Sequence, residues 1–190
     1  MSHLVWWYLA RASGMVARAL LVASLVWGVL LATRVLRPHD RPAWLLDLHR
    51  WLGSLALAMV GLHIASLIGD SFVHFGAADV LVPLASAWRP VPVALGVLSL
   101  YLLAAVEATS LAMRRLPRRA WRGVHLTSYG LVWLVSLHAG LAGTDVFNLA
   151  YRGVALVLTV AAVAATYVGL LAPRRPRRAA NGAARSAVRP

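Results

Sequence analysis

Five long apolar stretches dominate this 190-residue chain and limit what it can fold into. They occupy roughly residues 14–33, 44–69, 91–113, 122–143 and 150–172. A helix of about 20 residues crosses the roughly 30 Å of hydrocarbon in a bilayer. The chain is 61% hydrophobic and only 13% charged, a composition that soluble domains do not show. We therefore predict an all-α membrane protein built as a bundle of five transmembrane helices.

The basic residues set the expected orientation of this bundle. All nineteen are arginines, and fifteen of them lie in three segments, 34–50, 114–122 and 174–189. Such an excess of positive charge is typical of cytoplasmic loops, so we place the N-terminus outside and the C-terminus in the cytoplasm of a bacterial cell. Because the arginines separate apolar spans instead of covering one face, they favour membrane lipid as a partner and argue against nucleic acid.

Three regions are expected along the chain. Residues 1–13 form an outer N-terminal segment, residues 14–172 form the five-helix domain, and residues 173–190 form an arginine-rich, disordered cytoplasmic tail. The connection between Asp70 and Pro90 is interrupted by prolines and carries little positive charge. We expect it to be an outer loop with room for one short interfacial helix.

Four histidines lie inside the second and fourth spans with nearly matched spacing. His49 and His63 are 14 residues apart, and His125 and His138 are 13 apart. At 1.5 Å per residue, each helix holds its two imidazoles about 20 Å apart along its axis, near the two membrane faces. These two spans run in the same direction through the membrane. The expected pairs are therefore His49 with His125 at the cytoplasmic level and His63 with His138 at the outer level.

Two facing imidazoles can hold a six-coordinate haem b, a site suited to electron transfer because no iron position is left open. The chain has no cysteine, so any metal must use other ligands. A single histidine in a membrane span is usually a packed interior residue, but four in register favour ligation. One difficulty is that 13 steps of 100° turn His125 and His138 away from a common face. The fourth helix therefore needs a kink or bulge, for which Gly130 is a candidate, or ligands that reach from different sides.

Several motifs resemble the ferric reductase-like transmembrane family, which includes the haem-bearing parts of NADPH oxidases and the membrane subunit of bacterial methionine sulfoxide reductase systems. The motifs are WWYLARASG at 6–14, LHR at 48–50, GLH at 61–63, WRGVH at 121–125 and LHAG at 137–140. The likeness covers about residues 6–172 and implies ligation of two b haems by the four histidines. It also implies electron transfer from a cytoplasmic donor to an outer acceptor. Many members have six spans, and the oxidases continue into a flavin and nicotinamide domain.

No Gly-x-Gly-x-x-Gly loop and no soluble segment of domain size occurs in these residues, so we expect a separate electron donor. A flavoprotein reductase and membrane quinol are both open as donors. The arginines of 114–122 could dock an acidic flavoprotein, although fixing the topology and binding lipid headgroups is the favoured explanation.

Three arginines are candidates for holding the anionic carboxylates of haem: Arg50 and Arg122 near the cytoplasmic ligands, and Arg18 at the outer level. Arg18 could instead extend its guanidinium to the membrane surface. Glu107, inside the third span, is expected to form a structural ion pair.

These observations together predict the haem-bearing, electron-transferring subunit of an oxidoreductase, with no catalytic residues of its own. Its acceptor could be a ferric chelate, a partner reductase or oxygen. Two alternatives remain open at this point. One is a membrane scaffold or small transporter whose histidines line a proton or metal path, and the other is a quinol-dependent dihaem cytochrome b.

Overall fold

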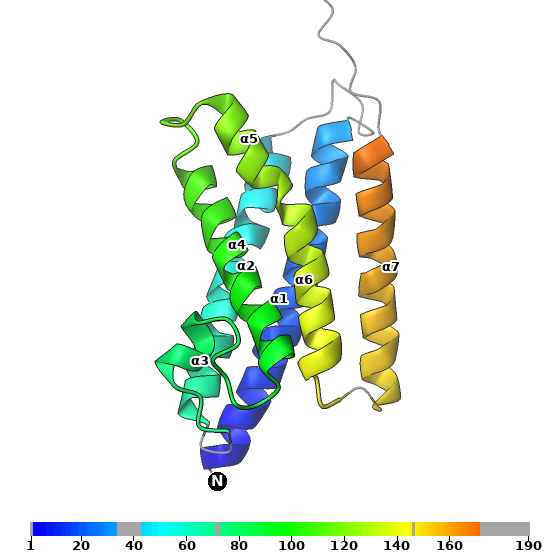
Figure 1. The fold of residues 1–190 in the computed structure, drawn as a ribbon. Helices are drawn as coiled ribbons and strands as arrows, with labels where there is room; N and C mark the ends of the chain where they lie inside the picture. Colours follow the sequence, from blue (N-terminus) through cyan, green and yellow to red (C-terminus); the bar gives the residue numbers. More distant parts are fainter. Residues whose placement is uncertain (1, 34–42, 71–72, 146, 172–190) are drawn as a thin grey trace, which may run out of the picture.

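The computed structural model describes residues 2–33, 43–70, 73–145 and 147–171. All regular elements in these ranges are helices (Figure 1). They are α1 (Ser2–Thr33), α2 (Ala43–Gly69), α3 (Ala77–Leu81), α4 (Pro90–Leu111), α5 (Arg118–Leu126), α6 (Ser128–Ala142) and α7 (Leu149–Leu171).

Five spans in the described ranges are long and apolar enough to cross a membrane, with α5 and α6 together forming the fourth. The prediction of an all-α bundle with five transmembrane helices is therefore confirmed. The side of the membrane that each terminus faces stays a prediction. The tail at 173–190 lies outside the described residues, as do the arginines at 34, 37 and 41 that entered the orientation argument.

Helix α1 is longer than the sequence suggested. It begins at Ser2, so residues 2–13 of the N-terminal segment expected at 1–13 are part of the first helix. The residues before Gly14 contain neither proline nor glycine, and Leu4 to Leu9 are almost all apolar. Nothing in this stretch stops a helix, which explains why the helix extends beyond the predicted start.

Two helix pairs build the bundle. Helix α1 packs along α2, and α4 packs along α6, while α1 also contacts α6 and α7. No extended backbone contact joins α2 to α6 in the described part of the chain. Small and aliphatic side chains from five helices meet in the centre: Leu21, Val22, Leu25, Val29, Ala56, Leu103, Leu131, Val132, Ala162 and Ala165. This cluster lies between the two pairs and fixes their spacing.

The fourth span is interrupted at Thr127, between α5 and α6. The Thr127 N–H donates to Val124 O at 3.0 Å, three residues back, and the Thr127 hydroxyl donates to the same carbonyl at 2.6 Å. A hydroxyl that competes for a backbone carbonyl disturbs the regular helical ladder. The distortion that the 13-residue spacing required is therefore present, but it lies at Thr127 and not at Gly130, which is helical.

The two ends of the bundle differ in their connections. The short helix α3 lies in the connection between Asp70 and Pro90, as expected, and Tyr101 of α4 donates a hydrogen bond to Leu81 O at its end. Helix α3 lies at the same end of the bundle as the N-terminus, and α5 lies at the opposite end (Figure 1). We call these the α3 end and the α5 end.

Candidate functional site: two facing histidine pairs

The four histidines in the spans meet as two pairs. The ring centroids of His49 and His125 are 6.0 Å apart near the α5 end, with 78° between the ring planes. Those of His63 and His138 are 6.5 Å apart near the α3 end, with 82° between the planes. The pairing that the topology predicted is confirmed, because each level receives one imidazole from α2 and one from α5 or α6.

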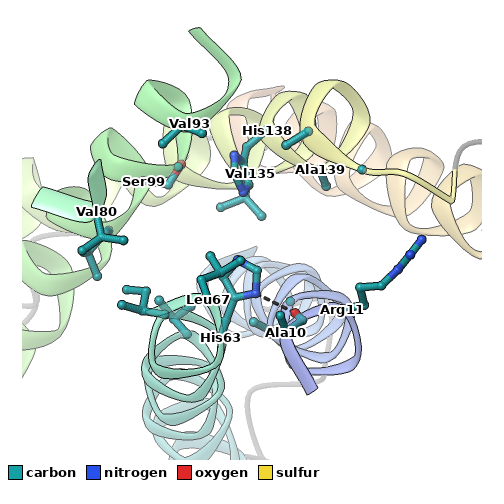
Figure 2. A pocket seen from close by; sticks show the side chains of 18 of the residues that line it. Ala10, Arg11, His63, Leu67, Val80, Val93, Ser99, Val135, His138 and Ala139 are labelled. Carbon is teal, nitrogen blue, oxygen red and sulfur yellow. Dashed lines mark hydrogen bonds between the residues drawn. The ribbon is translucent and has the colours of Figure 1, made fainter. Parts of the chain in front are cut away.

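Hydrogen bonds fix the orientation of the pair near the α3 end. His63 Nδ1 lies 2.7 Å from Ala10 O of α1 (Figure 2). His138 Nδ1 lies 2.7 Å from Pro92 O of α4. A carbonyl can only accept, so both Nδ1 atoms must carry the proton. Each Nε2 then keeps its lone pair, which is the form in which histidine binds a metal.

The pair near the α5 end is held less uniformly. His49 Nδ1 lies 3.3 Å from the Ser24 hydroxyl of α1. His125 instead stacks on Trp121, with ring centroids 5.1 Å apart and 22° between the planes. His125 Nδ1 and Trp121 Nε1 are buried and have no hydrogen-bond partner among the described residues. The four imidazoles are thus anchored by three hydrogen bonds and one ring stack.

A cavity of ≈ 300 Å³ surrounds the His63–His138 pair. Its wall comes from α1, α2, α3, α4 and α6 and is mostly apolar (Figure 2). Near the α3 end the wall also includes Trp7, Arg11, Asp145 and Tyr151. A pocket of this volume, apolar with a few polar groups at one edge, is typical of cofactor sites in proteins.

The chemistry of the donor set distinguishes between kinds of metal site. No group of three or more His, Cys, Asp or Glu side chains converges anywhere in the described ranges, whereas a bare zinc ion needs three or four protein ligands. Two facing imidazoles suit a metal whose other positions are filled by a macrocycle. A metal–nitrogen bond of about 2 Å from each ring also sets the ring centroids about 6 Å apart. The residues present therefore fit haem.

Two of the three arginines expected near haem carboxylates have other partners. Arg18 is buried and donates to the Thr159 hydroxyl of α7 at 2.9 Å, and it does not line the His63 cavity. Arg50 is exposed and lies 3.3 Å from Asp47, and Arg122 is exposed. The placement of Arg18 favours a role in joining α1 to α7 over contact with the cofactor.

Arg11 is the cavity arginine that the sequence analysis missed. Its Nε donates to Asp145 Oδ2 at 2.6 Å and its Nη2 pairs with Oδ1, so the contact is bidentate. The guanidinium carbon lies 3.9 Å from the Trp7 ring centroid. Arg11 is the only arginine among the described residues that line the cavity. Its position three residues before Gly14, in the WWYLARASG motif, was the available signal.

Glu107 lies on α4 with its carboxyl against Gly53 of α2, where a Cβ on the glycine would overlap Oε1. No salt bridge to Glu107 is found among the described residues, so the expected ion pair is absent from this part of the chain.

Comparison with known families agrees with the histidine geometry. The family described as ferric reductase like transmembrane component matches residues 13–137, about two thirds of the chain. The match includes His49, His63 and His125 and ends one residue before His138. No curated protein and no solved structure gives a significant match. The chain belongs to the ferric reductase-like transmembrane family.

Proposed function

We propose that this protein carries single electrons across the cytoplasmic membrane through two b haems. His49 with His125 would hold one, and His63 with His138 the other. The observation that carries this proposal is the arrangement of two facing imidazole pairs at two depths of one bundle. It agrees with membership of a membrane redox family.

The residues of this chain would bind and orient haem and exclude water from it. When bound, haem supplies an iron that accepts and releases one electron. His63 and His138 would hold haem between two neutral imidazoles, which would leave the iron for electron transfer and not for binding a substrate. The apolar cavity wall keeps water out, which limits side reactions and lowers the cost of moving charge.

The direction of transfer follows from the proposed orientation, with the α5 end in the cytoplasm. Arginines 118, 119 and 122 of α5 are exposed there, beside His125, and suit lipid headgroups or an acidic flavoprotein donor. Quinol is the other donor that the proposal allows. The acceptor would approach the α3 end, and its reduction need not occur within this chain.

Reduced-minus-oxidised difference spectra and haem quantitation on the purified full chain test this function. We expect a reducible b-type spectrum and two haems per chain. Adding quinol and reduced flavin separately then identifies the donor class. A purified chain with no reducible haem would overturn the proposal and favour a histidine-lined proton or metal path.

Arginines near the two histidine pairs would bind the negatively charged haem carboxylates. Arg50 and Arg122 remain the proposed partners near the α5 end. At the His63 level we propose Arg11 in place of Arg18, because Arg11 lines the cavity and Arg18 does not. A buried guanidinium offers a carboxylate paired, planar hydrogen bonds.

Comparing Arg11→Met with Arg18→Met separates the two arginines. We expect Arg11→Met to weaken haem retention at the His63 level about tenfold, the effect of losing roughly 1.4 kcal/mol of binding. Arg18→Met should instead change mainly the thermal stability, since Arg18 joins α1 to α7. Haem titration and melting temperature measure the two effects, and the exposed Arg152 provides a matched Arg152→Met control. Equal haem retention in Arg11→Met and Arg152→Met would show that Arg11 does not contact haem.

A further inference from the structure

Three of the four imidazoles contact a neighbouring helix in the same way, through one hydrogen-bonding residue and one glycine. His63 Nδ1 bonds to Ala10 O and its ring lies against Gly14. His138 Nδ1 bonds to Pro92 O and its ring lies against Gly96. In each case the hydrogen-bond acceptor belongs to residue i and the glycine is residue i+4.

His49 repeats the arrangement on α1. Its Nδ1 lies 3.3 Å from the Ser24 hydroxyl, and its ring lies against Gly28, again at i and i+4. The two glycines of α1 are 14 residues apart, as are the two histidines of α2 that they face. We call each combination of a hydrogen-bonding residue i and a glycine at i+4 a seat. We propose that the three seats, at residues 10/14, 24/28 and 92/96, position the imidazoles. The proposal rests on the function proposed above, since it gives the imidazoles a cofactor to hold.

The geometry of an α-helix explains why the glycine is needed. The carbonyl of residue i points along the axis toward the N–H of residue i+4. A ring that approaches this carbonyl from the side must pass over residue i+4, where a Cβ would stand. Glycine removes that obstacle, so the carbonyl can accept a second hydrogen bond from Nδ1 with its other lone pair.

The space beside each glycine predicts how strongly an alanine there would disturb the neighbouring imidazole. A Cβ on Gly96 would lie 2.8 Å from His138 Cε1, and one on Gly14 would lie 3.0 Å from His63 Nδ1. A Cβ on Gly28 would lie 3.1 Å from His49 Cε1 but 3.7 Å from its Nδ1. Alanine at position 96 or 14 therefore crowds the hydrogen-bonding atom itself, whereas alanine at position 28 mainly crowds the ring carbon.

His125 has no such seat. Its Nδ1 lacks a partner among the described residues, and Trp121 of its own helix supports the ring instead. The helix that carries it is interrupted two residues later, at Thr127. The seats therefore make the two levels unequal: both ligands are seated near the α3 end, and only one is seated near the α5 end.

The seats have a chemical consequence for a bound iron. Donation from Nδ1–H to a carbonyl makes the imidazole a stronger electron donor through Nε2. Stronger donation stabilises ferric iron and lowers the reduction potential. The seats also hold the paired rings close to perpendicular, at 78° and 82°, a relation that electron paramagnetic resonance detects in ferric bis-imidazole haem.

Alanine substitutions on the full-length protein, with haem bound, test the seats. We expect Gly96→Ala and Gly14→Ala to raise the midpoint potential of the haem at the His63 level and to change its resonance signal, with Gly96→Ala giving the larger shift. Gly28→Ala should act only on the haem at the His49 level. Ser24→Ala removes a hydrogen-bond partner without adding bulk and should shift the same potential as Gly28→Ala.

Gly61 of α2 and Gly130 of α6 are the matched controls, since a Cβ on either meets nothing within 4 Å. Gly61→Ala and Gly130→Ala should leave both potentials and both signals unchanged. NMR of isotope-labelled histidine in the haem-free protein adds an independent readout, because it detects the proton on Nδ1. The seats would be disproved if Gly96→Ala and Gly14→Ala left both midpoint potentials and the Nδ1 protonation unchanged in a protein that binds two haems. The proposed electron-transfer function would survive that result. A wild-type protein without haem would overturn the proposed function.

Discussion

His63→Ala is expected to reduce the haem content from two to one per chain and to abolish electron transfer through the membrane. The imidazole is one of the two proposed haem ligands at its level, and alanine would leave His138 to hold haem from one side only. The remaining haem at the His49 level should keep its spectrum, because that pair uses different residues. Haem quantitation and reduction of an outer acceptor by reconstituted vesicles measure both effects.

Two further variants make this result specific. His138→Ala should match His63→Ala, and the double variant should lose no more haem than either single variant, because two ligands of one site act as a unit. His74→Ala is the control, since His74 is exposed and lies outside the spans. If His63→Ala keeps two haems, the assignment of the pair as axial ligands is wrong.

Ala56→Leu should destabilise the whole bundle. Ala56 is completely buried on α2, between the levels of His49 and His63, and packs in the central cluster. Extra methylene groups in a well-packed core cost about 1–3 kcal/mol because neighbouring side chains and helices must move. Movement of α2 displaces both of its histidines, so haem retention should fall at both levels.

Ala58→Leu provides the comparison on the same helix. Ala58 is exposed on the bundle surface, where a longer side chain meets lipid, so stability and haem content should stay close to wild type. Thermal unfolding, followed by tryptophan fluorescence and by haem absorbance, measures both variants. An Ala56→Leu protein as stable as Ala58→Leu would show that the centre of the bundle is loosely packed.

Much of the fold could be predicted because the bilayer imposes length and apolarity on every span. The five spans followed from this constraint, and the pairing of His49 with His125 followed from the directions of two helices. The start of α1 was missed because Arg11 and Ser13 separate the apolar stretch Leu4 to Leu9 from the rest of the span in sequence, although the helix continues through them. A distortion of the fourth span was expected, but its position at Thr127 was missed because it depends on one side-chain hydroxyl bonding to Val124 O.

The levels and the pairing of the four histidines were predictable, but the side chains that surround each pair were not. Arg18 and Arg11 look equally suitable in sequence, and only the rotation of α1 shows that Arg11 reaches the cavity while Arg18 reaches Thr159. The glycines at 14 and 28 repeat the spacing of His49 and His63, so a signal was present. That these glycines contact the histidines depends on the register of α1 against α2, which sequence alone does not supply.

The division of the bundle into two helix pairs has a consequence for how the protein is assembled. Helices α1 and α2 are neighbours in the chain and pack along each other, so this hairpin can form as soon as both have entered the membrane during synthesis. Helices α4 and α6 form the second hairpin later. Each imidazole pair joins the first hairpin to the fourth span, and neither pair exists until that span is inserted. If the histidine pairs bind haem as proposed, haem can be inserted only after the fourth span has entered the membrane, and it would then join the two helix pairs.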